Sequence, residues 1–228
     1  MVSSGNTIIT RESIDKMDKI KRINLINSLS GYKSANLIGS ISNSGEENVA
    51  VFSSVVHLGS NPPLFGFILR PNVVPRNTYE NIKETGYYTL NHISEDIIED
   101  AHHTSAKYPK SISEFEVTNL TATYINEFQA PFVEESPIKI GMKYLEEYEL
   151  KANNTILLIG EVQFIHVNEA LLDQDGFVNL SEAGVATING LDGYAVPELW
   201  KRFDYQRPKS EEMIKASNEK RKKATFTL

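Results

Sequence analysis

The chain has 228 residues, 40% of them hydrophobic, and a formal net charge of −7, so it can bury the core of one compact domain. The negative charge argues against nucleic acid or an anionic membrane as a partner, because either would need a clustered basic face. The absence of cysteine excludes disulfides, thiolate nucleophiles and cysteine-ligated metals, so any redox chemistry has to come from an organic cofactor.

The N-terminal part carries no signal-peptide pattern, and no apolar stretch reaches the roughly 20 residues of a membrane span. We therefore expect a cytoplasmic protein. Residues 1–12 are polar and are expected to be loosely held. From Ser13 onward, apolar residues recur every three to four positions, which predicts a helix over residues 14–29 that is capped by Ser13 and ends near Gly31.

The next segments have the character of strands. Residues 35–43 and the β-branched run 49–56 predict a hairpin in which Gly45 is free to take a positive φ. A second apolar run, 64–69, follows the breaker segment 59–63. We therefore predict that the strands over 49–56 and 64–69 are joined by a rigid loop.

The segment after these strands has features of a phosphate site. Arg70 follows the strand, Arg76 ends a proline-bounded loop, and Asn77 begins the capping pattern of a helix start. The first amides of a helix lack internal partners and lie at the positive end of its dipole, so Asn77, Thr78 and the arginines would suit an anion. Glu80 argues against this, since a carboxylate already satisfies the same field. Spacing alone leaves open a capped surface helix with solvated arginines.

Polar residues also gather further along the chain. A strand over 87–93 follows Gly86, which is expected to close the preceding helix, and Ser94 begins a short acidic helix. That helix runs into the polar segment 102–107, ahead of a proline that stops it. This segment either contributes to a site or forms a solvated loop, and the sequence leaves both interpretations open.

Familiar catalytic patterns are absent from the sequence. His102 and His103 are adjacent and the other histidines lack the i, i+4 ligand spacing, which argues against a metal site. The chain contains no GxSxG elbow, and no GxGxxG motif follows a predicted strand. These patterns name no catalytic residue and no metal ligand.

The second half of the chain is β in character. Residues 138–144 and 155–167 predict strands, with Gly160 marking a bulge or a close approach of two chains. A Gly- and Pro-punctuated loop is predicted over 190–200, and the polar residues 208–228 are expected to form a tail or helix outside a single domain of residues 1–207. About seven strands in hairpin order favour an antiparallel barrel over a doubly wound parallel sheet.

Six segments of the chain are similar to the flavin reductase-like family. They are, in chain order, INSLSGYKSANLIGS, NVAVFSSVVHLGSNPPLFGFILRP, VPRNTYENIKETGYYTLNHI, AHHTSAKYPKSISEF, GEVQFIHVNEALLDQDGFVNL and GLDGY. The resemblance covers roughly residues 20–207. It implies a mainly β fold, an antiparallel Greek-key split β-barrel with a few peripheral helices, which binds FMN and forms a homodimer.

The resemblance also implies a set of cofactor contacts. One edge of the isoalloxazine would lie along five consecutive residues, Phe52, Ser53, Ser54, Val55 and Val56. The phosphate and ribityl end would be held by Arg76, Asn77 and Thr78, with Arg70 as a second charge. Asn91 would contact the ring, and the cofactor would be closed over by Ser105, Ala106 and Lys107. Lys107 is our candidate for the positive charge that favours the anionic reduced ring.

The resemblance implies an oxidoreductase, most simply an NAD(P)H-dependent flavin reductase that accepts hydride from NADH or NADPH and passes electrons to a flavin or a partner redox protein. The alternative is a flavoredoxin-like electron carrier that does not turn over nicotinamide. A split barrel that has lost its flavin is disfavoured by the intact segments FSSVV, RNT and TSAK. The sequence GLDGYAVP replaces the family's RLGGxxY ending, where the second substrate would approach.

Overall fold

The computed structural model describes residues 5–71, 76–211 and 213. The chain divides into two compact units, of which the first ends at Glu198 and the second begins at Leu199. The domain boundary expected at residue 207 remains a prediction. The proline-bounded loop predicted before Arg76 falls largely on residues 72–75, outside the described ranges, as does most of the predicted tail 208–228.

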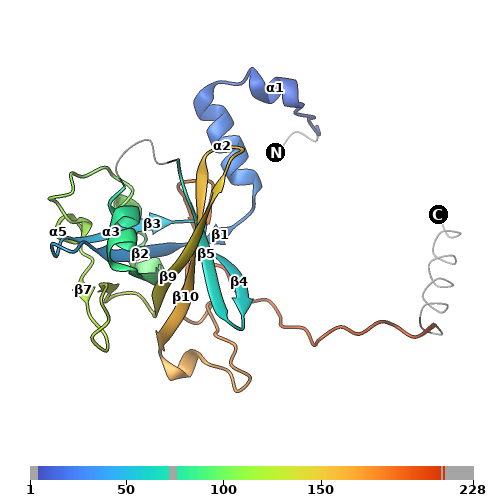
Figure 1. The fold of residues 1–228 in the computed structure, drawn as a ribbon. Helices are drawn as coiled ribbons and strands as arrows, with labels where there is room; N and C mark the ends of the chain where they lie inside the picture. Colours follow the sequence, from blue (N-terminus) through green and yellow to red (C-terminus); the bar gives the residue numbers. More distant parts are fainter. Residues whose placement is uncertain (1–4, 72–75, 212, 214–228) are drawn as a thin grey trace, which may run out of the picture. The chain divides into compact units, whose positions relative to one another are not determined.

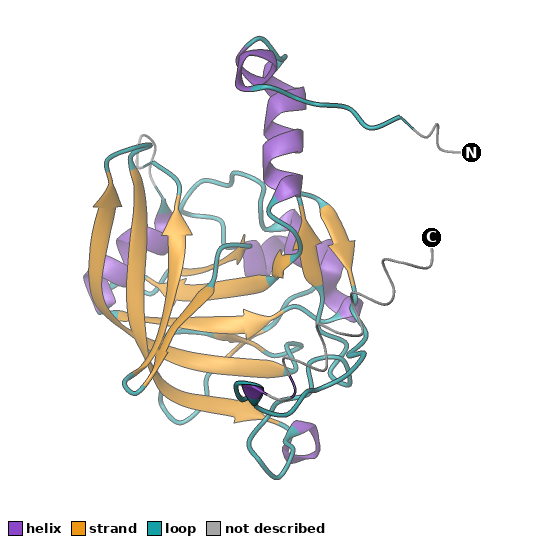
Figure 2. Ribbon diagram, turned by 90° about the vertical axis from the view of Figure 1, so that its right-hand side faces the viewer, coloured by secondary structure: helices purple, strands orange, loops and turns teal. Residues whose placement is uncertain are grey.

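The first unit is built on one seven-stranded antiparallel sheet (Figures 1 and 2). In spatial order its strands are β3 (Glu47–Phe52), β2 (Asn36–Ile41), β6 (Tyr87–His92), β9 (Ile138–Leu150), β10 (Thr155–Val167), β5 (Pro63–Leu69) and β4 (Val56–Ser60). Neighbours in this order are not always neighbours in sequence, because β2 pairs with β6 and β5 pairs with β10. The fold is therefore the mainly β split barrel that the sequence predicted.

Two small sheets and short helices complete the described structure. The small sheets join β1 (Lys33–Ser34), β11 (Thr187–Asn189) and β12 (Gly193–Ala195), and β7 (Ala122–Thr123) with β8 (Phe132–Val133). The helices are α1 (Arg11–Asp15), α2 (Lys19–Leu29), α3 (Asn77–Thr85), α4 (Ile98–His103) and α5 (Glu114–Val117), with 3₁₀ turns η1 (Glu95–Ile97) and η2 (Glu169–Leu171). No helix in the described ranges has the length and apolar character that a membrane crossing needs.

Two groups of buried side chains form the core. One lies within the barrel and includes Phe67, Tyr88 and Leu158, while the other includes Leu37 and Ile188. At Gly160 the register between β9 and β10 shifts, and a Cβ there would collide with the Tyr88 hydroxyl. The bulge and the close approach expected at this glycine are therefore both confirmed.

Several other elements agree with the sequence. β10 has the predicted bounds of 155–167. Helix α3 begins at Asn77 and ends at Thr85, and the cap residue Gly86 has a φ of 78°, the left-handed conformation of a helix terminator. Gly45 has a φ of 89° in the turn between β2 and β3. These signals are local, and the surrounding packing does not override them.

The prediction of a single N-terminal helix over residues 14–29 is wrong. The structure has two helices, α1 capped by Thr10 and α2 capped by Asp18. The Asp18 carboxylate accepts hydrogen bonds from the amides of Ile20 and Lys21 at 2.9 and 3.2 Å. This cap starts a second helix. The apolar periodicity continues across the non-helical residues between the two helices, so the sequence pattern did not reveal the interruption.

The prediction of one strand over residues 49–56 is also wrong about where the strand ends. β3 stops at Phe52, and Val56 begins β4, which pairs with β5. The Ser54 hydroxyl holds the corner between them by bonding to the amide and the carbonyl of Ile68 at 3.1 and 3.0 Å. At this corner, hydrogen bonds of the Ser54 side chain take the place of main-chain hydrogen bonds between strands. The apolar residues alone had predicted a continuous strand here. β4 is consequently an additional strand within the predicted connection.

Candidate functional site

A groove of about 1230 Å³ lies at this corner of the barrel, between β3, the start of α3, the loop after α4 and the end of α2. Most of the residues expected at a cofactor site line it. They are Phe52, Ser53, Ser54, Arg70, Arg76, Asn77, Thr78, Ser105, Ala106 and Lys107. The fold therefore brings together segments that are more than fifty positions apart in the sequence.

Three of the expected residues lie elsewhere. Val55 packs against the barrel core, and Val56 begins β4 with 46% of its surface exposed. Asn91 is fully buried, and its side chain bonds to the Leu37 carbonyl, the Thr89 hydroxyl and the Val133 amide. The position of Asn91 therefore does not support the ring contact expected of it, because its amide is used to join strands.

The start of α3 is open to an anion. Arg76 is the N-cap residue and its side chain makes no capping hydrogen bond, while the first helical bond runs from the Glu80 amide to the Arg76 carbonyl. Thr78 is buried and its hydroxyl accepts a bond of 3.0 Å from Asn48 Nδ2. Glu80 Oε1 lies 3.4 Å from the Arg76 amide, a long contact that leaves the following amides of the first turn available.

The Arg76 side chain supplies the strongest indication of an absent ligand. Its Nε is buried and has no hydrogen-bond partner among the described residues, and its Nη2 reaches only the Pro71 carbonyl at 3.5 Å. A buried guanidinium donor without a partner is costly, and a phosphate oxygen would satisfy it. The groove at this point therefore fits the phosphate that an FMN cofactor would bring.

Further cations lie along the same part of the groove. We name the residues Arg70, Arg76, Lys107 and Lys110 the cationic end. Glu114 lines it as a buried carboxyl that accepts a bond of 3.2 Å from the Val49 amide, and burial raises its pKa above the ordinary value. The excess of positive groups makes this end suited to a dianionic ligand.

The loop after α4 is held in a defined shape. The amides of Ser105 and Ala106 bond to the carbonyls of His102 and His103 at 3.0 Å, and His103 Nε2 lies 2.7 Å from the Tyr108 hydroxyl. Ser105, Ala106 and Lys107 are exposed at the groove. This segment, which the sequence left open as a loop or a site, therefore forms one wall of the groove.

The opposite part of the groove was missed by sequence reasoning. We name it the hairpin end, and it is lined by Ile26, Asn27, Ser30, Lys33, Ile188, Leu191 and Asp192. It depends on the hairpin of β11 and β12, within a stretch predicted as a loop from residue 190. Gly190 in the three-residue turn and Gly193 directly after it were the available signal, but strands of three residues give no periodicity.

The described residues contain no group of three or more His, Cys, Asp or Glu side chains that could hold a metal ion. The structure is that of a split-barrel protein with a groove that has positively charged side chains at one end. The family model of the flavin reductase like domain matches residues 31–203, so the chain belongs to the flavin reductase-like family.

Solved structures show the same fold. The “putative flavin reductase with split barrel domain” from Shewanella frigidimarina NCIMB 400 is 44% identical, covers 88% of this chain and 100% of its own, and has a TM-score of 0.85. Nitrilotriacetate monooxygenase component B from Bacillus cereus is 21% identical, with coverages of 89% and 100% and a TM-score of 0.75. Flavoredoxin of Desulfovibrio vulgaris (Miyazaki F) is 20% identical, with coverages of 76% and 91% and a TM-score of 0.67.

Proposed function

We propose that this protein is an FMN-binding oxidoreductase that is reduced by NADH or NADPH and passes the electrons to a flavin or a partner redox protein. The observation that carries the proposal is the buried, unpartnered Arg76 Nε beside the uncapped start of α3, which fits a phosphate monoester. The cofactor, when bound, supplies the hydride chemistry that the side chains of this chain lack.

The residues of the groove would divide the work of binding. Arg76, Asn77 and Thr78 hold the phosphate, and Arg70 adds charge at the same end. The backbone of Phe52–Ser54 lies along one edge of the ring, and Lys107 places a positive charge beside its polar edge. A positive charge in that position stabilises the anionic reduced ring more than the neutral oxidised ring, which raises the reduction potential.

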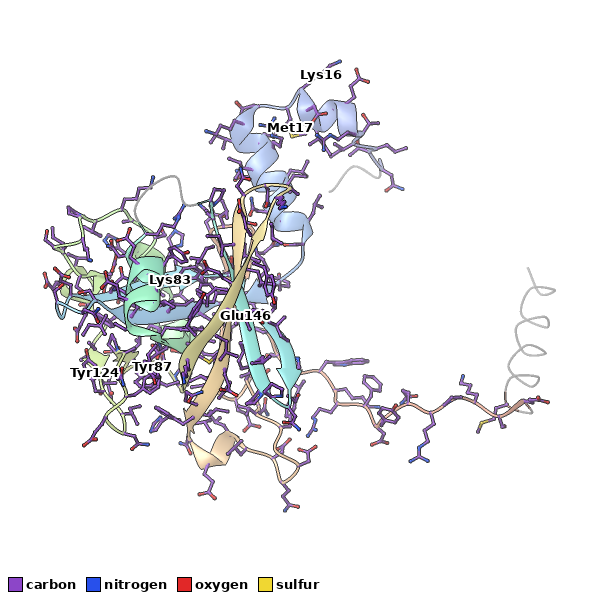
Figure 3. The ribbon with its side chains drawn as sticks, viewed as in Figure 1. Lys16, Met17, Lys83, Tyr87, Tyr124 and Glu146 are labelled. Carbon is purple, nitrogen blue, oxygen red and sulfur yellow. The ribbon has the colours of Figure 1, made fainter. Side chains whose placement is uncertain are left out.

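A homodimer is supported by one uncovered face of the sheet. Residues that pair directly across strands share a face, and these pairings align Val56, Ile68, Leu157, Ile159 and Tyr148. Val56 and Tyr148 are 46% and 52% exposed, and the main helix packing in the described unit falls on β2 and β3. Glu146, in the same row as Ile159, marks this face in Figure 3.

This apolar face adjoins the groove, because Ile68 belongs to both. We propose that a second copy of the chain covers it. Light scattering at micromolar concentration should give the mass of a dimer, and Tyr148→Glu should shift the protein towards the monomer. A wild-type monomer at that concentration would contradict the proposal.

An absorbance spectrum tests the main proposal. Purified protein should be yellow or take up added FMN, and its flavin bands should bleach when NADH or NADPH is added under anaerobic conditions. Bleaching by dithionite alone would instead favour the flavoredoxin-like carrier. A colourless protein that also fails to bind added FMN would disprove flavin binding.

A further inference from the structure

Lys33 ties together two walls of the hairpin end. Its Nζ donates to the Gly190 carbonyl at 2.6 Å and to the Asn27 carbonyl at 3.3 Å. Gly190 lies in the turn between β11 and β12, and Asn27 lies in the last turn of α2, where a cation is favoured by the helix dipole. The side chain is partly buried, and burial lowers the pKa of its ammonium group.

The hairpin that Lys33 holds has a fixed shape. Gly190 has a φ of 70°, which favours glycine, and a Cβ at Gly193 would lie 2.9 Å from the Asn189 carbonyl oxygen. On the other strand, the Tyr194 hydroxyl lies 3.2 Å from His102 Nδ1, which ties the hairpin to α4. The turn therefore presents Leu191 to the groove from a position set by contacts on both sides.

The groove is larger than one cofactor requires. Ligand pockets for one small molecule usually measure about 300–1000 Å³, whereas this groove measures about 1230 Å³. If the phosphate lies at the cationic end, the remaining space is bounded by the apolar side chains of Ile26, Ile188 and Leu191. Polar groups of Asn27 and Ser30 and the charged groups of Lys33 and Asp192 also line it. Such walls suit a flat ring with hydrogen-bonding edges.

We propose that Lys33 is a positioning residue, which locks the β11–β12 hairpin to α2 and thereby sets the affinity of a second, ring-shaped ligand at the hairpin end. The inference rests on the proposed function and deepens it. The second ligand is either the nicotinamide of the electron donor or the isoalloxazine of an acceptor flavin, since both are flat rings with amide-like edges. Lys33 acts on this ligand through the carbonyls of the protein and not through its own charge.

The test compares three variants that are purified in the same way and that remain folded. Lys33→Met keeps the apolar stem and removes both hydrogen bonds, Lys33→Arg keeps a cationic donor, and Lys16→Met is the matched control. Lys16 is a surface lysine that directly follows α1, and its Nζ lies 2.6 Å from Glu12 Oε1 (Figure 3). Thermal unfolding of each variant confirms that the fold is retained.

In Lys33→Met, the KM for NADH or NADPH at saturating FMN should rise about tenfold, a loss typical of one or two hydrogen bonds that fix a binding wall. The kcat and the dissociation constant of FMN should stay within about twofold, and Lys33→Arg should restore most of the KM. Equal losses for FMN and the donor, or no loss for either, would overturn the proposal.

If the protein does not turn over NADH or NADPH, a binding experiment replaces the kinetic test. Wild-type protein loaded with FMN is titrated with NAD⁺ and, separately, with riboflavin by calorimetry. Binding of one of them that weakens about tenfold in Lys33→Met identifies the second ligand. Failure of FMN to bind would contradict the proposed function, whereas FMN binding without either second ligand would contradict only the role of Lys33.

Discussion

The two ends of the groove use positive charge in different ways. At the cationic end, Arg76 Nε has no partner among the described residues, so its charge and donors are available to a ligand. At the hairpin end, the Lys33 ammonium is bonded to two main-chain carbonyls of the protein. Under the proposed function, the cationic end would recognise its ligand by charge, whereas the hairpin end uses its ammonium group to hold two segments together and would recognise its ligand by shape.

The largest effect is expected at the cationic end. Arg76→Ala should weaken FMN binding about 30- to 100-fold, because charge-assisted bonds to a phosphate are worth about 2–3 kcal/mol. Riboflavin, which lacks the phosphate, should bind with nearly unchanged affinity. Fluorescence titration of both ligands measures the difference, with the exposed Arg11→Ala as the control. Equal losses for FMN and riboflavin would show that Arg76 does not recognise the phosphate.

A smaller effect is expected from Lys107, in the loop after α4. Lys107→Ala should lower the midpoint potential of bound flavin by about 30 mV, equivalent to about tenfold in the relative affinity for reduced and oxidised flavin. Redox titration with a reference dye measures it. Lys16→Ala, which removes a surface lysine that does not line the groove, is the matched control. An unchanged potential in Lys107→Ala would remove this lysine from the ring environment.

The hairpin end should respond more weakly to loss of its second tie. Tyr194→Phe removes the hydroxyl that lies 3.2 Å from His102 Nδ1 and keeps the ring that packs edge-on against the imidazole. The KM for the donor should rise about threefold with the FMN affinity unchanged, because one neutral bond contributes about 0.5–1.5 kcal/mol. Tyr124→Phe, which loses a surface bond to Glu47, should change neither constant (Figure 3).

The smallest effect on ligand binding is expected from His92, which belongs to the barrel and should affect stability instead. His92 Nδ1 is buried without a partner among the described residues, and burial lowers the pKa of His92 from 6.5 to about 4. The unfolded chain therefore binds this proton at a higher pH than the folded chain, so stability is lost as the pH falls from about 6.5 to about 4.

Urea unfolding at pH 7, 5.5 and 4.5 measures the loss from His92. In His92→Leu the dependence on pH across this window should be shallower, and the affinity for FMN at pH 7 should equal that of the wild type. A dependence that is the same in both proteins would assign the acid sensitivity to other groups.

The residues of the cationic end other than Lys110 were named from the sequence, because the motifs that contain them are local. Arg76, Asn77 and Thr78 are consecutive at a helix start, and Ser105–Lys107 form one turn, so each motif is complete within a few residues. Their meeting in one groove followed from the family resemblance.

The hairpin end could not be predicted in the same way. Its central bond joins Lys33 to Gly190, which are 157 positions apart, and neither residue stands out in its own segment. Asn91 is a related case, since the ring contact that the resemblance implies for it stays a prediction, while its amide bonds to the main chain of Leu37 and Val133 inside the core. Long-range pairing decides both cases, and it leaves no pattern in the local sequence.

Helix α2 extends away from the barrel (Figures 1 and 2), and none of its eleven residues is buried. Ile20 and Leu29 are 62% and 71% exposed, and an isolated helix of this length is barely stable in water. Its backbone amides should therefore exchange hydrogen rapidly in dilute protein and slowly once another surface covers the helix. Helix α2 supplies Ile26 and Asn27 to the groove. If the covering surface belongs to a second copy of the chain, the hairpin end should therefore become better ordered as the protein concentration rises.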